Sequence, residues 1–206
     1  MTTIPTSPLP PIPVLETGRL ILRPLRQDDA PALQRRFPHW EVVRYLYTQV
    51  PWPYPADGAA VHIAKCLGEM SRREKHHWTI RLRSEPDELI GGMSLWPDNG
   101  TSRDQRGFWL DPEFQGCGLM TEAAERVTEY AFRELGWPHL WLSNAEANGA
   151  SGRIKEKQGA KLVGYEPASF VSGDGRRMVW LLAREDWLSR RTSSHAHPDR
   201  ERPARS

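Results

Sequence analysis

The sequence predicts a mixed α/β fold in a single domain. Its 206 residues suit one domain with a core of its own. Apolar residues recur at helical spacing between residues 119 and 135. Short runs typical of strands stand on either side, at residues 105–111 and 139–145. A strand, a helix and a strand in this order imply a parallel pair joined by a right-handed crossover.

The other elements are predicted from the same patterns in chain order. The helix at residues 119–135 ends at Gly136. The further expected strands are residues 18–24, 76–83, 88–96, 160–166 and 177–184. The further expected helices are residues 27–36, 56–71 and 149–158.

The two ends of the chain differ in composition from the middle. Residues 1–13 hold five prolines and no apolar run suited to a signal peptide, so we expect a disordered arm. Residues 14–188 form the predicted domain. Residues 189–206 hold five arginines and two acidic residues, a net charge of +3, among Ser, His and Pro. They are predicted to be a disordered basic tail.

Composition excludes several classes of function. The chain carries a net charge of +2, and subtracting the tail's +3 leaves about −1, so the domain lacks the basic surface of a DNA-binding protein. No apolar stretch reaches the roughly 18 residues of a membrane span. Two cysteines make no disulfide framework, which fits a cytoplasmic protein. No Cys/His or His/Glu spacing suits zinc, so no metal is predicted.

A glycine-rich loop, Asp111–Glu122, leads from the strand at residues 105–111 into the next helix. Gly116 and Gly118 stand where the helix begins, and the first turn of a helix presents free N–H groups and a positive dipole end. The loop therefore predicts a phosphate or pyrophosphate site. No Lys-Ser/Thr follows Gly118, and Thr121 stands where a Rossmann loop needs a glycine, so both nucleotide motifs fail. A turn that only caps the helix is the alternative.

A second segment, Asn148–Ala160, follows the strand at residues 139–145. Asn148 is a good N-cap residue, and Ser151 would then lie in the first turn of a helix. Capping alone is one interpretation of these two side chains. Contact with a ligand is the other.

Together the two segments resemble the GNAT acyl-CoA N-acyltransferases. The loop is similar to the order Gln-x-x-Gly-x-(Gly/Ala), except that Met120 takes the last position. The second segment is similar to Asn-x-x-Ser-x-x-(Val/Leu)-x-Glu-Lys-x-Gly-Phe. Further likeness to the RimJ/RimL-like branch, which acetylates ribosomal-protein N-termini, lies at residues 15–25, 42–46, 89–92 and 181–187. The resemblance implies a twisted, mostly antiparallel sheet of six to seven strands, one splayed parallel pair and about four helices.

The resemblance also implies a site for acetyl-CoA. Backbone N–H groups of the loop would hold the pyrophosphate, Asn148 would contact the pantetheine arm, and a backbone N–H near Leu110 would hold the thioester oxygen. An ordinary strand residue is the alternative for Leu110. Ser151 would donate a proton to the departing thiolate. The predicted cofactor-binding residues are Leu110, Gln115, Gly116, Cys117, Gly118, Leu119, Met120, Thr121, Asn148 and Ser151.

The general base is not identified by the resemblance. Gln105 stands where many relatives carry a glutamate, and an amide cannot take a proton. Asp104 would point the other way on a regular strand. Glu41 and Glu146 are the alternatives, and each also fits a solvated surface carboxylate.

The acceptor pocket is expected near an aromatic stretch after the first helix. Trp52, Tyr54 and Trp78 are the predicted acceptor-binding residues, with core packing as the alternative. Such a pocket favours a flat, cationic or apolar-tipped amine over a highly charged polyamine.

The sequence therefore predicts an N-acetyltransferase that moves an acetyl group from acetyl-CoA to a small amine or a protein N-terminus in a ternary complex. One alternative is an antibiotic or amino-sugar acetyltransferase, which the same fold supports. Another is a catalytically silent acyl-CoA-binding module, which Gln105 favours. Relatives often form homodimers, so the oligomeric state stays open.

Overall fold

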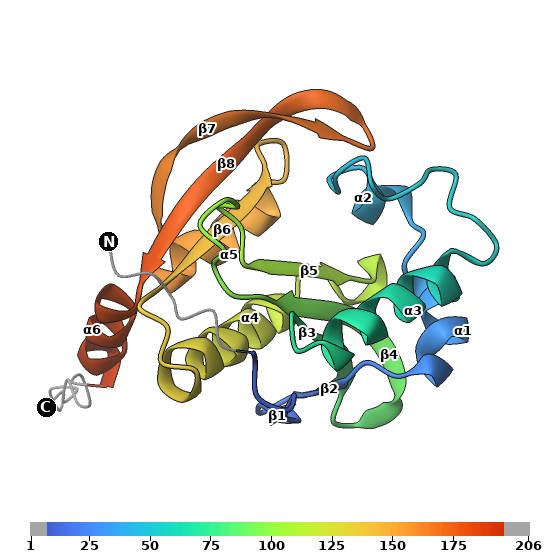
Figure 1. Ribbon diagram of the computed structural model, residues 1–206. Helices are drawn as coiled ribbons and strands as arrows, with labels where there is room; N and C mark the ends of the chain where they lie inside the picture. The colour runs from blue at the N-terminus through green and yellow to red at the C-terminus, as the bar shows by residue number, and fades with distance from the viewer. Residues whose placement is uncertain (1–7, 196–206) are drawn as a thin grey trace, which may run out of the picture.

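The computed structural model describes the backbone of residues 8–195 and the side chains of residues 8–191 (Figure 1). It contains two sheets in which every neighbouring pair is antiparallel. The first sheet has the order β1 (Leu15–Glu16), β2 (Leu20–Pro24), β3 (His76–Leu82), β4 (Glu85–Leu95) and β5 (Arg106–Leu110). The second has the order β6 (His139–Ala145), β8 (Gly173–Ala183) and β7 (Lys161–Phe170).

The described chain contains six α-helices. They are α1 (Ala30–Arg36), α2 (Trp40–Val43), α3 (Gly58–Ser71), α4 (Leu119–Glu129), α5 (Gly149–Gln158) and α6 (Arg184–His195). A π-helical turn, Tyr130–Glu134, continues α4. A short 3-10 helix, Gln27–Asp29, precedes α1.

The two sheets meet at one point, where β5 and β6 begin. The Gln105 N–H donates to the Trp141 carbonyl at 2.9 Å, and the Trp141 N–H donates to Gln105 Oε1 at 2.8 Å. Beyond this point no ladder joins β5 to β6 in the described chain, and Figure 1 shows β6 rising away from β5. The gap that the splayed pair opens is therefore fixed by the buried side chain of Gln105.

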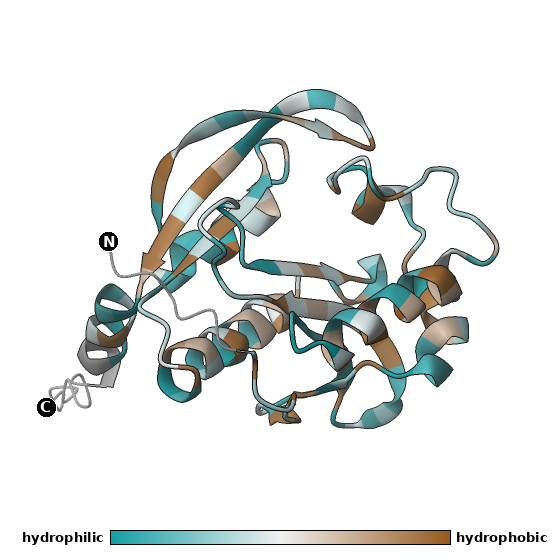
Figure 2. Cartoon of the chain, viewed as in Figure 1, coloured by the Kyte–Doolittle hydropathy of each residue, from teal (hydrophilic) through white to brown (hydrophobic). Residues whose placement is uncertain are grey.

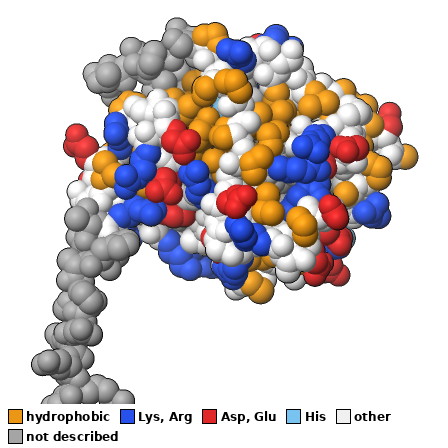
Figure 3. All heavy atoms as spheres, turned by 90° about the horizontal axis from the view of Figure 1, so that it is seen from below, with side chains coloured by type: hydrophobic (Ala, Val, Ile, Leu, Met, Phe, Trp, Pro, Cys, Tyr) orange, Lys and Arg blue, Asp and Glu red, His pale blue; other side chains and the backbone are white. Residues whose placement is uncertain are grey.

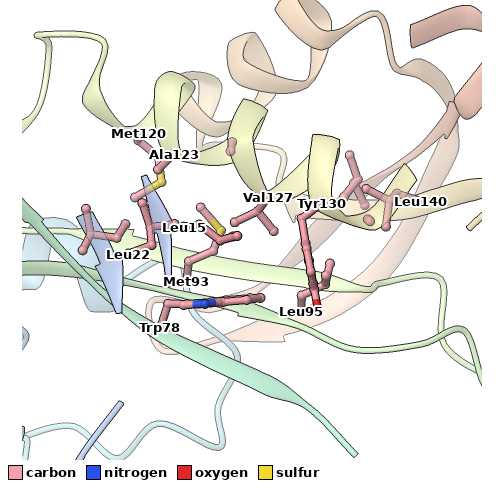
Figure 4. Close-up of a cluster of buried hydrophobic side chains, with 14 of the residues drawn as sticks. Leu15, Leu22, Trp78, Met93, Leu95, Met120, Ala123, Val127, Tyr130 and Leu140 are labelled. Carbon is pink, nitrogen blue, oxygen red and sulfur yellow. The ribbon is translucent and has the colours of Figure 1, made fainter. Parts of the chain in front are cut away.

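Two apolar cores hold the elements on opposite faces of the first sheet. α4 packs Val127 and Tyr130 against Leu22, Trp78 and Met93 (Figure 4). A second core lies under α1 and α3, whose apolar sides face inward (Figure 2), and it is built from Leu33, Phe37, Val43, Ile63 and Cys66. β3 is buried along nearly its whole length because it supplies side chains to both faces.

The outer surface carries both signs of charge. On the face in Figure 3, Lys and Arg side chains alternate with Asp and Glu around apolar ones, and neither sign covers the face. None of the helices in the described part of the chain is both long and apolar enough to cross a membrane.

The predicted mixed α/β class and its mostly antiparallel character are confirmed. The strands form two sheets instead of the one expected, because β5 and β6 separate without forming a parallel ladder in the described chain. The counts differ, since eight strands and six α-helices stand where six to seven and about four were expected. β1 has two residues and α2 has four, which is too short for a periodic pattern. α6 follows β8 directly, so no turn residue in the sequence marks where this helix begins.

The predicted disordered ends are wrong where the structure describes them. Leu9 is buried in the first core, and the Pro13 carbonyl accepts a hydrogen bond from Trp78 Nε1 at 2.7 Å. At the other end α6 extends to His195, anchored by buried Trp187 against Phe132 with ring centroids 5.5 Å apart. Both anchors are long-range contacts that composition does not reveal. Residues 1–7 and 196–206 lie outside the described residues, and the domain boundaries stay a prediction.

Candidate active site

A groove of about 770 Å³ lies where β5 and β6 separate. Four segments line it: the end of β5, the glycine-rich loop, the start of α5, and the stretch that contains α2. Their side chains include Arg44, Arg153 and Lys157. Three cationic side chains and a helix N-terminus along one groove favour an anionic ligand.

The glycine-rich loop has the backbone that its sequence predicts. Gly116 and Gly118 have φ values of +80° and +78°, a left-handed conformation that side chains rarely adopt. Gly118 is the N-cap residue of α4, so the N–H groups of its first turn have no intrahelical acceptor. Arg19 Nη1 donates to the Cys117 carbonyl at 3.0 Å, and its charge is paired with the Glu122 carboxylate of α4 at 2.7 Å. The loop therefore has the backbone geometry that an anion site needs.

Gln115 holds the start of the glycine-rich loop in place. Its side-chain Nε2 donates to the Leu110 carbonyl at 2.9 Å, and its own N–H donates to the Pro112 carbonyl at 3.2 Å. Both contacts fix the exit from β5. Gln115 also lines the groove, and its contact with a phosphate stays a prediction.

The N–H of Leu110 faces the gap between β5 and β6. Antiparallel pairing makes successive N–H groups point to opposite edges of a strand. The Asp111 N–H donates to the Ile90 carbonyl of β4 at 2.9 Å, so the Leu110 N–H points to the other edge. The Leu110 carbonyl points there too, where Gln115 caps it.

Asn148 and Ser151 lie together at the start of α5. Asn148 Oδ1 accepts a hydrogen bond from the Ser151 N–H at 3.1 Å, so the N-cap interpretation is confirmed. Lys155 Nζ donates to Ser151 Oγ at 2.8 Å. Because Lys155 is the donor, the Ser151 hydroxyl keeps its own proton for another acceptor. Asn148 and Ser151 both line the groove.

The two carboxylates predicted as bases lie in different places. Glu41 lines the groove and is exposed. Glu146 is bound by Arg176 at 2.7 and 2.9 Å on the outer surface. A carboxylate held by a guanidinium outside the groove is a poor proton acceptor, so the structure argues against Glu146.

Asp104 is the carboxylate that the sequence interpretation set aside. The prediction treated it as part of a regular strand, but β5 begins at Arg106, and Asp104 lies in the preceding loop. Its Oδ2 accepts a hydrogen bond from Ser143 Oγ at 2.8 Å. Its Oδ1 is buried and has no hydrogen-bond partner in the described chain. Burial raises the pKa of Asp104 to about 6.

A second cavity, of about 410 Å³, lies over the opposite face of β3, β4 and β5 from α4. Its wall is largely apolar and includes Leu33, Phe37 and Val50. It shares three lining residues with the groove, namely Leu46, Phe108 and Trp109. The two hollows are therefore neighbours, separated by β5 and the segment after α2.

Only one of the three predicted acceptor residues lies in this cavity by its side chain. Tyr54 lines it and packs edge-on against Phe37, with ring centroids 5.2 Å apart. Trp52 packs on Trp40 at the surface, outside the lining. Trp78 points into the core beneath α4 (Figure 4), so only its backbone reaches the cavity floor. Trp109, which was not among the predicted acceptor residues, also lines this cavity and packs edge-on against Phe37, with ring centroids 5.2 Å apart.

One group of metal-type ligands lies at the far end of this cavity. Donor atoms of Cys66, Glu69 and His77 lie within 4.8 Å of one another. The Glu69 carboxylate already accepts from Lys75 at 3.1 Å and contacts His77 at 2.8 Å, and Ser94 contacts the other nitrogen of that imidazole at 2.7 Å. An ammonium on the same carboxylate opposes a divalent cation, so the hydrogen-bonded chain accounts for these residues.

These features are those of a protein whose two sheets part to leave a groove suited in shape and charge to an elongated anionic ligand. A family model described as "Acetyltransferase (GNAT) domain" matches residues 19–161. With this match over more than half its length, the chain belongs to the GNAT family of acetyltransferases.

Individual relatives agree with the family match. The chain is 32% identical over 108 residues to "Probable N-acetyltransferase YjcK" of Bacillus subtilis (strain 168). The matched region covers 52% of this chain and 59% of that protein. The chain is 24% identical over 175 residues to "Uncharacterized N-acetyltransferase YnaD" of the same organism. That match covers 84% of this chain and 98% of the relative. The first match thus spans less than two thirds of that relative.

A solved structure shows the same fold. The chain is similar to the structure titled "RimL- Ribosomal L7/L12 alpha-N-protein acetyltransferase in complex with Coenzyme A", with a TM-score of 0.69 and 19% identity. The likeness covers 84% of this chain and 97% of that one.

Proposed function

We propose that this protein transfers an acetyl group from acetyl-CoA to a primary amine that carries an apolar group. The single observation that supports this most is the pairing of two hollows across β5. One is a groove with an anion-binding loop, and the other is an apolar cavity, and they share Leu46, Phe108 and Trp109. Two adjoining sites suit a reaction between two bound substrates.

The groove fits coenzyme A in a defined direction. The pyrophosphate would rest on the N–H groups from Gly116 to Thr121, with Arg44, Arg153 and Lys157 as nearby cations. The pantetheine arm would lie along the free edge of β5 as an added strand. The thioester oxygen would then meet the Leu110 N–H, which points to that edge. Cys117 would contribute its N–H only, because its thiol lies at the exposed phosphate end.

The proposed reaction has four steps. The neutral amine nitrogen attacks the thioester carbon, a C–N bond forms, and negative charge gathers on the oxygen near the Leu110 N–H. The C–S bond then breaks. The Ser151 hydroxyl, whose proton is free to donate, hydrogen-bonds the departing sulfur. The nitrogen loses one proton to a base.

The apolar cavity favours an acceptor with a hydrophobic or aromatic group beside its amine. A protein N-terminus with an apolar first side chain and an arylalkylamine both have this form. The similar RimL structure is titled an alpha-N-protein acetyltransferase, which supports the protein N-terminus. A ribosomal-protein acceptor would place the reaction in the cytoplasm. Amino sugars and aminoglycosides suit the cavity poorly, because their many hydroxyl and ammonium groups would be desolvated against apolar walls.

A panel of amines tests this proposal. Acetyl-CoA is incubated with the protein and with phenylethylamine, a peptide with an N-terminal apolar residue, spermidine or an aminoglycoside, and CoA release and acetylated product are measured. We expect the highest kcat/KM for the two apolar amines. Preference for spermidine or the aminoglycoside would contradict the acceptor class. Acetyl-CoA binding with no transfer to any amine would favour the silent acyl-CoA-binding module.

A further inference from the structure

A chain of hydroxyl groups leads from the segment after α2 to the half-buried carboxylate of Asp104 at the origin of the splayed strands. Tyr47 Oη lies 3.1 Å from Ser143 Oγ, and Ser143 donates to Asp104 Oδ2 at 2.8 Å. Since the Ser143 proton points to Asp104, Tyr47 is the donor to Ser143. Arg177 donates to Tyr47 Oη at 3.3 Å and fixes its position. Every hydrogen bond in the chain thus points toward Asp104.

A buried lysine stands on the other side of the same gap. Lys155 is buried on α5, with Nζ 2.8 Å from Ser151 Oγ and 5.4 Å from the centre of the Phe108 ring. Burial, together with the charge of Arg106, lowers the pKa of Lys155 to about 7. The resemblance to the family specifies no residue type at this position of the Asn148–Ala160 segment, so sequence reasoning did not select it.

The carboxylate and the ammonium act on each other through their charges. Lys155 and Arg177 lower the pKa of Asp104 against the effect of burial, while Asp104 raises the pKa of Lys155. Arg177 is itself paired with Glu166 at 2.6 Å, and Arg106 is held by Thr128 at 2.6 Å and Gln158 at 2.8 Å. Those two arginines have partners of their own, and no hydrogen bond joins Asp104 to Lys155 in the described chain, so these two groups act on each other through charge alone.

We propose that Asp104 and Lys155 form an acid–base pair that serves both ends of acetyl transfer, an inference that rests on the proposed function. The amine proton would pass through the Tyr47 and Ser143 hydroxyls to the Asp104 carboxylate. The sulfur would take the Ser151 proton, which the Lys155 ammonium replaces. Asp104 has then gained one proton and Lys155 has lost one. Water then takes the proton from Asp104 and returns one to Lys155, which restores the starting charges.

The first test is the pH dependence of kcat with Asp104→Asn. Asp104 must be ionised to accept a proton, so the wild-type rate should fall as pH drops through about 6. In Asp104→Asn we expect kcat to fall about 100-fold and this acid limb to disappear. Asp186→Asn, a carboxylate on α6 paired with Lys161, is the matched control. An acid limb that persists in Asp104→Asn would overturn the proposal.

The hydroxyl chain is tested at Ser143. We expect Ser143→Ala to lower kcat about tenfold and to leave the KM for acetyl-CoA unchanged. Ser143→Thr keeps a hydroxyl, so it should retain most of the wild-type kcat. A purely structural role would instead make alanine and threonine differ in melting temperature rather than in kcat. Equal kcat values for the alanine and threonine variants would contradict the chain.

The coupling is tested without any acetyl transfer, which separates a failure of this proposal from a failure of the proposed function. The protein has five lysines. NMR of ¹³C-labelled lysine follows each Cε shift with pH, and the Lys155 signal is the one lost in Lys155→Met. We expect its midpoint near 7 in the wild type. Asp104→Asn removes the charge that favours the ammonium, so the midpoint should fall further. An unchanged midpoint in Asp104→Asn would show that the two groups do not act as a pair.

Discussion

The donor half of the site and the acceptor half are built in different ways. The proposed phosphate end of the donor half is continuous in sequence, since the glycine-rich loop and the start of α4 would form it from backbone N–H groups. The acceptor half is assembled from side chains far apart in the chain, such as Phe37, Tyr54 and Trp109. A site made of backbone needs only the right turn, whereas a site made of side chains needs the whole fold.

The largest effect should follow from filling the acceptor cavity. Val50 lines it and is half-buried. We expect Val50→Trp to lower kcat/KM for an apolar amine about 100-fold, because the indole takes the space of the acceptor. Binding of acetyl-CoA, measured by calorimetry, should stay the same. Val163→Trp, at an exposed site on β7, is the matched control. Equal loss of acetyl-CoA binding in Val50→Trp would show that the two hollows are not separate sites.

A smaller effect is expected on the donor side at Ser151. Ser151→Ala removes one hydrogen bond to the departing sulfur, so kcat should fall about tenfold, or ~1.4 kcal/mol. Steady-state kinetics at saturating acetyl-CoA measure this. If kcat is unchanged, the sulfur takes its proton from elsewhere, and Ser151 serves only the start of α5.

Asn148 has two roles that substitutions separate. Asn148→Ala removes the cap on Ser151 and should lower the free energy of unfolding by ~1 kcal/mol. Asn148→Asp keeps the cap, so its stability should match the wild type within a few tenths of a kcal/mol. If the amide also contacts pantetheine, both variants raise the KM for acetyl-CoA. Unchanged KM in the aspartate variant would leave Asn148 as a cap alone.

The smallest effect is expected at Glu41. Its side chain is exposed, and surface substitutions away from special contacts change little. We therefore expect Glu41→Gln to change kcat/KM by less than about twofold, with its pH profile kept. Loss of the acid limb in this variant would identify Glu41 as the base in place of Asp104.

These contrasts also explain how far the sequence could predict the molecule. The strand, loop and helix around Gly116 and Gly118 were predicted because glycine spacing and helical periodicity are local signals. Trp78 was misplaced because an aromatic residue on a strand buried on both faces gives no sign of its direction. Asp104 was set aside because its direction depends on where β5 begins. The role of Gln105 as the bridge to Trp141 is a contact between sheets, which no local pattern encodes.

The central claim is that the glycine-rich loop binds the phosphates of acetyl-CoA. Calorimetric titration of acetyl-CoA into the wild type, Gly116→Glu and Gly100→Glu tests it most directly. Gly116 and Gly100 both have a left-handed φ, +80° and +74°, and at both positions no atom lies within 4 Å of an added Cβ. The two glutamate variants therefore add the same charge with a similar backbone strain. We predict micromolar binding for the wild type and Gly100→Glu, and binding at least about 100-fold weaker, or ~2.7 kcal/mol, for Gly116→Glu. Equal binding by all three proteins, or none by the folded wild type, would contradict the account.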